Sequence, residues 1–261
     1  MSRRTKRPTG FYDAVEYIGP RPQKPRKKHH FFGGWVILLI AVGAAWIFGK
    51  QLLPTVRAAE NGASMENLDR TIVRLKEAGD FGSHLAAAAL AEARSPAVHD
   101  ESYYKISYPN GDVPAGRGNA EDVIIRAYRE QGIDLQQLVH EDMEKNFRDY
   151  DQVTKIQGTD TNIDHRRAPN LKRFFERNGQ TLSTSRNAAD YLPGDIVFLI
   201  LPGSHSGGDA HSQIKLHMAV IVPGPADHAS EPAIVHNLET CTKWDDVLFS
   251  YQIMGHFRYG Q

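Results

Sequence analysis

The segment that most constrains the fold is residues 117–129 (RGNAEDVIIRAYR), where a polar loop runs into an amphipathic helix. Asn119 is a preferred N-cap, because its side-chain oxygen can accept a hydrogen bond from a free amide of the first turn. Glu121 and Asp122 then place negative charge at the positive end of the helix dipole. Apolar side chains follow at helical spacing, namely Val123, Ile124, Ala127 and Tyr128. We therefore expect a short buried helix that ends at Gly132.

Composition limits the classes of function. The 261 residues contain 31 Lys and Arg against 31 Asp and Glu, so no global positive field recruits nucleic acid. The first thirty residues are nevertheless strongly basic, with only Asp13 and Glu16 as acids. Cys241 is the single cysteine, so the chain forms no internal disulfide. The length suits one sizeable domain plus extensions.

Residues 1–30 predict a basic cytoplasmic tail. They contain prolines and few aliphatic side chains, a composition typical of disorder. The span 9–18 adds three aromatic residues and has two interpretations. It is either a docking motif for a cytoplasmic partner or, as we favour, part of a weakly structured tail.

Residues 31–50 predict a transmembrane anchor. The stretch 31–49 carries no charge and, at ~1.5 Å per residue, just crosses a hydrocarbon core of roughly 30 Å. Trp35 and Trp46 lie near its ends, where interfacial aromatic residues are enriched. The positive charge precedes the span, so the N-terminus is expected in the cytoplasm and the rest outside. A cleavable signal peptide is the alternative, but the basic leader and the apolar run are too long for one.

Residues 51–96 are interpreted as a helical stalk. Ser64 caps a first helix that ends before Gly79, and a second helix covers 85–94. We expect the stalk to pack on the surface of the next domain rather than on a partner helix. That domain spans 97–261. A short strand at 103–108 opens it, helices at 135–147 and 170–178 come next, and four strands at 196–201, 216–222, 233–237 and 252–259 close it. Helices before an antiparallel sheet indicate an α+β fold.

A series of motifs in this domain resembles one bacterial family. They are YPNGDVP at 108–114, RGNAEDVIIRAYR at 117–129, DTNIDHRR at 160–167, PGDIV at 193–197, HMAVIV at 217–222, VHN at 235–237 and GHFRY at 255–259. In this order they resemble domain-of-unknown-function family 1287. That family is similar to the NlpC-type, papain-like cysteine peptidases and amidases, which cut the stem peptides of peptidoglycan. The resemblance implies a papain-like domain with helices packed on an antiparallel sheet. Together with the predicted anchor, this places the domain in the periplasm, held at the bacterial inner membrane.

The resemblance also assigns catalytic positions. In a papain-like enzyme a cysteine at a helix N-terminus is the nucleophile, a strand histidine is the base, and a third polar residue orients that histidine. These positions fall on Ala120, His217 and His236. A methyl group cannot attack a carbonyl, so the three positions are vestigial. Cys241 lies in no helix-start context and is interpreted as an incidental thiol.

Ligand-binding residues are expected around these positions. The polar stretch 160–167 supplies Asp164, His165, Arg166 and Arg167, and the flanking positions supply Asp122 and Asn237. Guanidinium groups bind carboxylates in a bidentate manner, so Arg166 or Arg167 is a candidate for pairing with a stem peptide. The alternative is a network of Asx turns that only shapes the loop.

A metal site is the weaker hypothesis. His205, Asp209 and His211 lie close together in sequence near His217, and imidazole and carboxylate groups suit zinc. Their spacing matches no zinc motif, so a solvated Gly- and Ser-rich loop is favoured and no cofactor is expected.

These observations lead to one main functional hypothesis and two alternatives. The main one is a membrane-anchored, catalytically inactive papain-like domain whose partners are peptidoglycan stem peptides or an envelope enzyme that it regulates or scaffolds. The first alternative is an active cell-wall hydrolase that uses a metal-bound water through His205, His211 and His217. The second is an assembly scaffold that recruits a partner through the tail at 11–17.

Overall fold

The computed structural model describes residues 19, 38–39, 41–42, 64–154, 158–201, 215–225 and 228–260. The chain divides into two compact units, Met1–Thr55 and Val56–Gln261. The predicted tail and anchor therefore fall almost wholly outside the described residues, which retain only the helical pairs 38–39 and 41–42 of the anchor. Within the described part of the chain, no helix combines the length and apolarity needed to cross a membrane.

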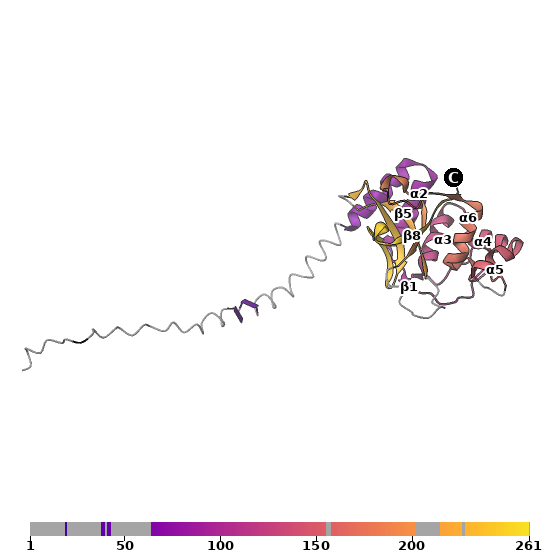
Figure 1. The fold of residues 1–261 in the computed structure, drawn as a ribbon, viewed down its shortest axis with the longest axis horizontal. Coiled ribbons are helices and arrows are strands. Elements are labelled where there is room, and N and C mark those ends of the chain that lie inside the picture. Colours follow the sequence, from indigo (N-terminus) through magenta and orange to yellow (C-terminus); the bar gives the residue numbers. More distant parts are fainter. Residues whose placement is uncertain are drawn as a thin grey trace, which may run out of the picture. The chain divides into compact units, whose positions relative to one another are not determined.

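The second unit is an α+β fold built on one curled sheet (Figure 1). Its helices are residues 64–78, α2 (Phe81–Arg94), α3 (Ala120–Glu130), α4 (Leu135–Lys145), α5 (Phe147–Thr154) and α6 (Ala168–Asn178). Its strands are β1 (Val98–His99), β2 (Arg117–Gly118), β3 (Gln180–Thr181), β4 (Ile196–Ile200), β5 (Leu216–Pro223), β6 (Pro232–Leu238), β7 (Cys241–Asp245) and β8 (Gln252–Arg258). Short 3₁₀ turns occur at Asp164–Arg166, Ala188–Asp190 and Leu248–Ser250.

The sheet order is β2-β1-β7-β6-β5-β4-β8-β3. The expected antiparallel sheet is correct for every pair except β1 and β2, which run parallel. The sheet is therefore mixed. The parallel pair ties the start of α3 to the sheet, because β2 ends directly before α3 and β1 joins β2 to the remaining strands.

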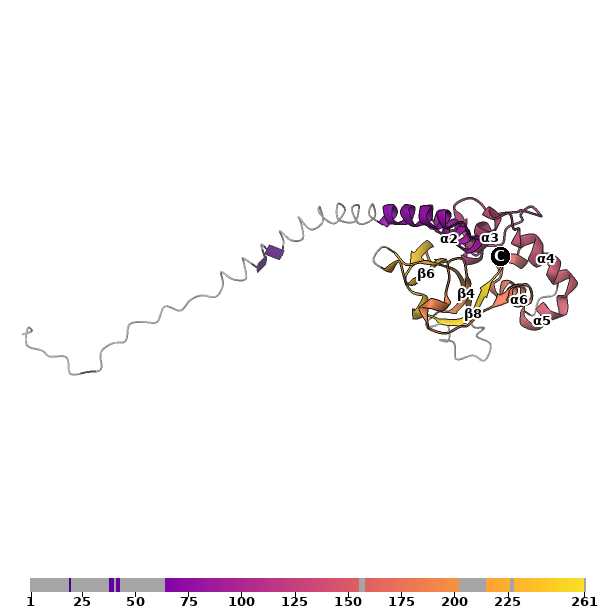
Figure 2. The same ribbon diagram turned by 90° about the horizontal axis from the view of Figure 1, so that it is seen from above.

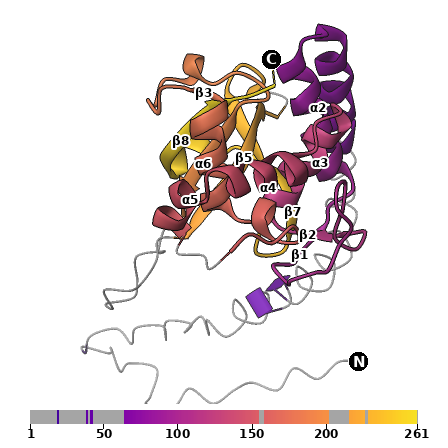
Figure 3. The same cartoon turned by 90° about the vertical axis from the view of Figure 1, so that its right-hand side faces the viewer.

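The helices cover one face of the sheet, as Figures 1 and 3 show. On β4 and β5, Phe198, Met218 and Val220 pack with the helices, whereas Val197 and Ala219 pack in a second cluster on the other face. Successive side chains of a strand point to opposite faces. Both faces are buried, so β4 is the continuous apolar run IVFLI rather than an alternation.

The two helices that we expected as a stalk form part of this core. Leu68, Ile72 and Leu75 of the helix at 64–78 are buried in the main cluster, together with Leu85 and Leu90 of α2. Figure 2 shows both helices lying along the domain. The apolar faces of these helices are buried against the same core as α3 and the sheet, within one compact unit.

A close backbone contact fixes the start of α2. A Cβ atom at Gly82 would lie 2.5 Å from the carbonyl oxygen of Pro193, and one at Gly194 would lie 2.3 Å from the carbonyl oxygen of Gly82. Gly194 also has a φ of +86°, a conformation that residues with a side chain rarely adopt. The turn before β4 and the first turn of α2 thus require glycine on both sides.

The expected strand at 103–108 is wrong. The backbone there is irregular, and its polar groups bond to side chains instead of a neighbouring strand. The Ile106 amide donates to Asn162 Oδ1 at 2.9 Å, and the Ser107 carbonyl oxygen accepts from Gln136 Nε2 at 2.8 Å. Aromatic composition indicated a strand here, but the Asn162 side chain that replaces a strand partner is distant in sequence.

Asp195 anchors the other end of the sheet. Its carboxylate accepts hydrogen bonds from Arg258 Nε at 2.7 Å and from the amide of Leu192 at 2.9 Å, and it bonds His256 Nε2 at 2.9 Å. Its side chain is 1% exposed. Burial alone would raise the pKa of Asp195, but the hydrogen bonds from His256 and Arg258 outweigh it, so the pKa lies below its usual value.

We expect Asp195→Asn to lower the free energy of unfolding by about 3–5 kcal/mol, because it leaves the Arg258 charge without its partner. A carboxyl whose folded pKa is depressed stabilises the fold above its unfolded pKa, so the difference from wild type should shrink as the pH falls below about 4. Urea denaturation at pH 7 and at pH 3 measures both effects. The control is Asp69→Asn, which removes an exposed ion pair with Arg94 and should cost less than about 1 kcal/mol.

Candidate functional site

The first turn of α3 forms the centre of the candidate site. Asn119 accepts a hydrogen bond from the Asp122 amide at 3.0 Å, and Asp122 Oδ2 accepts one from the Asn119 amide at 2.8 Å. This reciprocal capping box confirms the helix start predicted from the sequence. Ala120 is the first helical residue and is 4% exposed.

Asp122 is paired with Arg166 in the interior. Arg166 Nε donates to Oδ1 at 2.8 Å and Nη2 donates to Oδ2 at 2.9 Å, with side chains that are 1% and 4% exposed. The remaining Arg166 amino group donates to the carbonyl oxygen of Ser102 at 2.8 Å. Neither residue is therefore free to bind a ligand carboxylate, and the ligand role expected for them is replaced by a structural one.

The rest of the stretch 160–167 contains an Asx turn, as in the alternative interpretation, and also bonds to neighbouring elements. Asp160 Oδ1 accepts the Asn162 amide at 2.8 Å, an Asx turn. Asp164 Oδ2 bonds His140 Nδ1 at 2.9 Å, and burial raises the pKa of Asp164 despite this partner. His165 is 1% exposed, and burial with the nearby Arg166 charge lowers its pKa to about 3. Of the candidates in this stretch, Arg167 is the exposed one.

A line of side chains crosses three neighbouring strands. His217 Nε2 on β5 lies 2.8 Å from His236 Nδ1 on β6, and His236 Nε2 lies 3.2 Å from Asp245 Oδ2 on β7. The two histidines are 7% and 2% exposed. The family resemblance placed both histidines at the base and orienting positions. It missed Asp245, because β7 is a short strand after a tight turn and was not predicted. A Lys-Trp-Asp run shortly after the VHN strand is the signal that a hairpin prediction would have used.

Hydrogen bonding assigns the ring protons along this line. If His236 donates from Nε2 to Asp245, its Nδ1 accepts a hydrogen bond from the Nε2–H of His217, and His217 Nδ1 keeps a free lone pair. Burial, reinforced by the adjacent His236, lowers the pKa of His217 to about 3. The hydrogen bond from His236 in turn lowers the pKa of Asp245. The line therefore connects the uncharged imidazole of His217, through His236, to a carboxylate.

Strand β1 connects this line to the start of α3. His99 pairs in register with Gly118, two residues before Ala120, and its Nδ1 lies 2.9 Å from Asn237 Oδ1, next to His236. Asn237 is 0% exposed and also donates to the carbonyl oxygen of Ala97 at 2.9 Å. The binding role expected for Asn237 is therefore not available to it, because it links β1 to β6.

Charged side chains surround this junction. Lys215, which precedes His217 by two residues, lies 2.5 Å from Glu101, and Glu101 lies 3.4 Å from His99. Glu121 is 9% exposed in the first turn of α3. Burial raises the pKa of Glu121 to about 7, helped by the neighbouring Asp122 and Glu101 charges. The sequence suggested Glu121 only as a dipole partner, because its burial depends on tertiary packing.

The expected metal candidates His205, Asp209 and His211 lie outside the described residues. Among the described ones, His228, Glu231 and Asp246 have ligand atoms within 4.8 Å of one another. All three are exposed, and none of them belongs to the histidine line. The His228 ring lies 3.8 Å from Glu231, and the described part of the chain supplies no buried partner that would orient this ring as metal ligands usually are.

Comparison with known proteins gives two findings. The family model described as "Domain of unknown function (DUF1287)" matches residues 86–259, which includes most of α2 and every strand named above. The uncharacterized protein YijF of Escherichia coli (strain K12) is 42% identical over 175 residues, which cover 67% of this chain and 80% of that protein. No solved structure matches.

The protonation of His217 is directly measurable. We expect its imidazole to remain neutral from pH 8 down to about pH 4, because its pKa is about 3. In the urea-unfolded chain the same ring should titrate near the usual value of about 6.5. Proton–carbon NMR of ring-labelled histidine, assigned with His217→Gln, checks this. A His217 resonance that shifts with a midpoint above pH 6 in the folded chain would contradict the lowered pKa of His217.

We expect the contribution of Glu121 to the free energy of unfolding to depend on pH in the opposite direction to that of Asp195. A carboxyl whose folded pKa is raised favours folding below its unfolded pKa, and this contribution is lost as the pH rises through about 7. We expect Glu121→Gln to raise the free energy of unfolding at pH 9 by up to roughly 3 kcal/mol relative to wild type, and to have little effect at pH 4. Glu130→Gln, on the exposed last turn of α3, is the matched control and should stay within about 0.5 kcal/mol at both pH values.

Proposed function

Because this chain belongs to the DUF1287 family, we propose that it is a catalytically silent relative of the NlpC-type, papain-like cell-wall enzymes. In this proposal the domain binds peptidoglycan stem peptides without cleaving them. The predicted anchor at 31–50 holds it at the inner membrane with the folded domain in the periplasm. The observation that carries the proposal is the His217–His236–Asp245 line, in which the two histidines are buried and the carboxylate is partly exposed. It lies on the sheet to which β1 and β2 tie the start of α3, where Ala120 has only a methyl group.

The chemistry behind this proposal is the division of labour in a cysteine hydrolase. The base needs a free imidazole nitrogen and an orienting partner, and the nucleophile needs a sulfur atom at the positive end of a helix. Here His217 Nδ1 is the free nitrogen and His236 is the orienting partner, which Asp245 supports in turn. Ala120 has no atom that can form an acyl intermediate, so such a site can hold a peptide but not open it by this route.

Exposed cations near the junction suit a peptide that carries carboxylates. Lys215 has a side chain that is 66% exposed, and Arg167 is also exposed. Neither belongs to the buried Asp122–Arg166 pair, and Lys215 would exchange its exposed partner Glu101 for an anionic ligand. We infer that they supply affinity at the rim, whereas the histidine line shapes the interior of the site. We therefore propose for Arg167 the binding role that the sequence suggested.

Restoring the sulfur tests this proposal. In Ala120→Cys we expect the new thiol to react with iodoacetamide at pH 7 faster than Cys241, because the helix start favours the thiolate. Adding His217→Ala should slow that reaction, since a positioned base contributes about 10²–10⁴-fold. Mass spectrometry that follows both cysteines in one sample provides the internal control.

The activity arm uses a labelled stem peptide. We expect wild type to bind it, measured by fluorescence anisotropy, without releasing fragments in the presence or absence of a chelator. Ala120→Cys should release fragments, and Ala120→Ser is the control for a polar group of similar size that lacks sulfur. If wild type cleaves as fast as Ala120→Cys, the silent-domain proposal is wrong. If neither protein binds the peptide, the ligand is wrong.

A further inference from the structure

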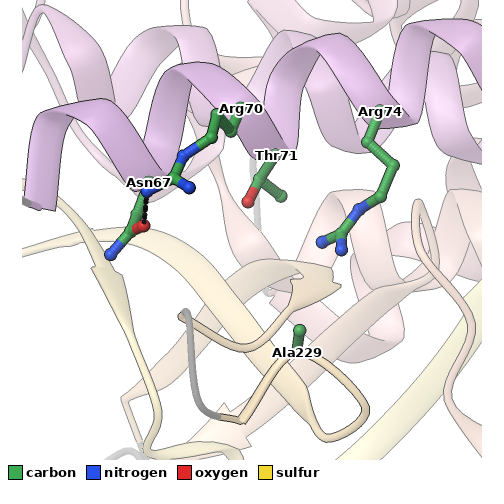
Figure 4. Close-up of a pocket in the computed structure, with 5 residues that line it drawn as sticks. All are labelled: Asn67, Arg70, Thr71, Arg74 and Ala229. Carbon is green, nitrogen blue, oxygen red and sulfur yellow. Dashed lines mark hydrogen bonds between the residues drawn. The ribbon is translucent and has the colours of Figure 1, made fainter.

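A cavity lies between the helix at 64–78 and the loop at 228–231. It has a volume of about 260 Å³ and is lined by Asn67, Arg70, Thr71, Arg74 and Ala229. Figure 4 shows the four helix residues on one side and Ala229 opposite them. Their spacing of three, four and seven residues places the four on the same helix face. The cavity shares no residue with the candidate site and does not depend on the proposed function.

The polar groups in this cavity are mainly donors. Arg70 Nη2 donates to Asn67 Oδ1 at 2.8 Å, which occupies the amide oxygen and leaves the Asn67 nitrogen free to donate. The Thr71 side chain, which carries a hydroxyl, lies between the two arginines (Figure 4). Thr71 is only 6% exposed. Such a set of donors around a hollow is the arrangement that an oxyanion requires.

The two guanidinium groups lack carboxylate partners that would fill the cavity. Within the described part of the chain, Arg74 forms no ion pair, and Arg70 meets only Glu66 at 3.7 Å on the exposed surface. Two acids beside the opposite loop, Glu231 and Asp246, group with His228 instead. Like charges one turn apart on a helix repel each other, so an anion between Arg70 and Arg74 removes a destabilising interaction.

We propose that this cavity binds a phosphate group between Arg70 and Arg74. Guanidinium groups match the geometry of phosphate oxygens, and two of them balance a dianion. The volume of about 260 Å³ is below the roughly 300–1,000 Å³ of sites for drug-sized ligands, so it suits a small group. The phosphate is either free or part of the headgroup of an anionic glycerophospholipid, and the experiment separates these two sources.

The first experiment maps protection of arginines in the full chain. The protein is treated with phenylglyoxal, which modifies accessible guanidinium groups, and the rate at each arginine is read by mass spectrometry. The probes are inorganic phosphate and a short-chain phosphatidylglycerol below its micellar concentration. The controls are chloride at equal ionic strength and the matching phosphatidylcholine. Arg148, an exposed arginine of α5, reports general screening.

We expect either phosphate probe to slow modification of Arg70 and Arg74 about tenfold at saturation, with Arg148 unchanged. Protection by both probes assigns the site to any phosphate group, and protection by the lipid alone assigns it to the headgroup. If neither probe protects, or if Arg148 is protected equally, the proposal is wrong.

A pair of variants gives a second, independent measurement by calorimetric titration with the protecting probe. Arg74→Gln should weaken binding about tenfold, because one charge-assisted hydrogen bond is lost. Lys76→Gln removes the same charge from another face of the same helix and should leave the affinity within about twofold. Equal weakening by both variants would mean that net charge, rather than this cavity, attracts the anion, and would also overturn the proposal.

Discussion

The buried pair between Asp122 and Arg166 is the interaction on which the rest of the site depends. One carboxylate caps α3 through the Asn119 amide and also binds Arg166 at two points. The same guanidinium reaches the carbonyl oxygen of Ser102, in the segment after β1. The Asp122–Arg166 pair thus holds together the start of α3, the loop at 160–167 and the segment after β1. A buried pair of this kind costs desolvation and is kept only where its remaining donors and acceptors are satisfied.

This arrangement explains what the sequence could predict. Local signals were sufficient where one turn of chain decides the outcome, as at Asn119, whose capping box involves residues three apart. Apolar runs were sufficient for β4 and β5, which are buried on both faces. The strand histidines also emerged, because the family motifs order them along the chain.

The remaining features depend on contacts between residues far apart in sequence. Arg166 and Asp122 are 44 positions apart, and no local pattern distinguishes an arginine that binds a ligand from one that binds an aspartate inside the protein. The segment 103–108 resembles a strand, yet Asn162 satisfies its backbone from 56 positions away. The first two helices were expected to pack on the surface of the domain, but an amphipathic face does not show that its apolar side chains belong to the main core.

Position 120 also bears on the charge state of its surroundings. In a cysteine hydrolase a thiolate at the helix start compensates a protonated imidazole. With a methyl group there, a charged His217 would be buried without an opposite charge, and desolvation would oppose it. The pKa values of about 3 for His217 and about 7 for Glu121 agree with this desolvation effect, since both shifts favour the uncharged form in the interior. A ligand that brings an anion next to His217 would therefore raise the pKa of that imidazole, so peptide binding and protonation at this site are expected to be coupled.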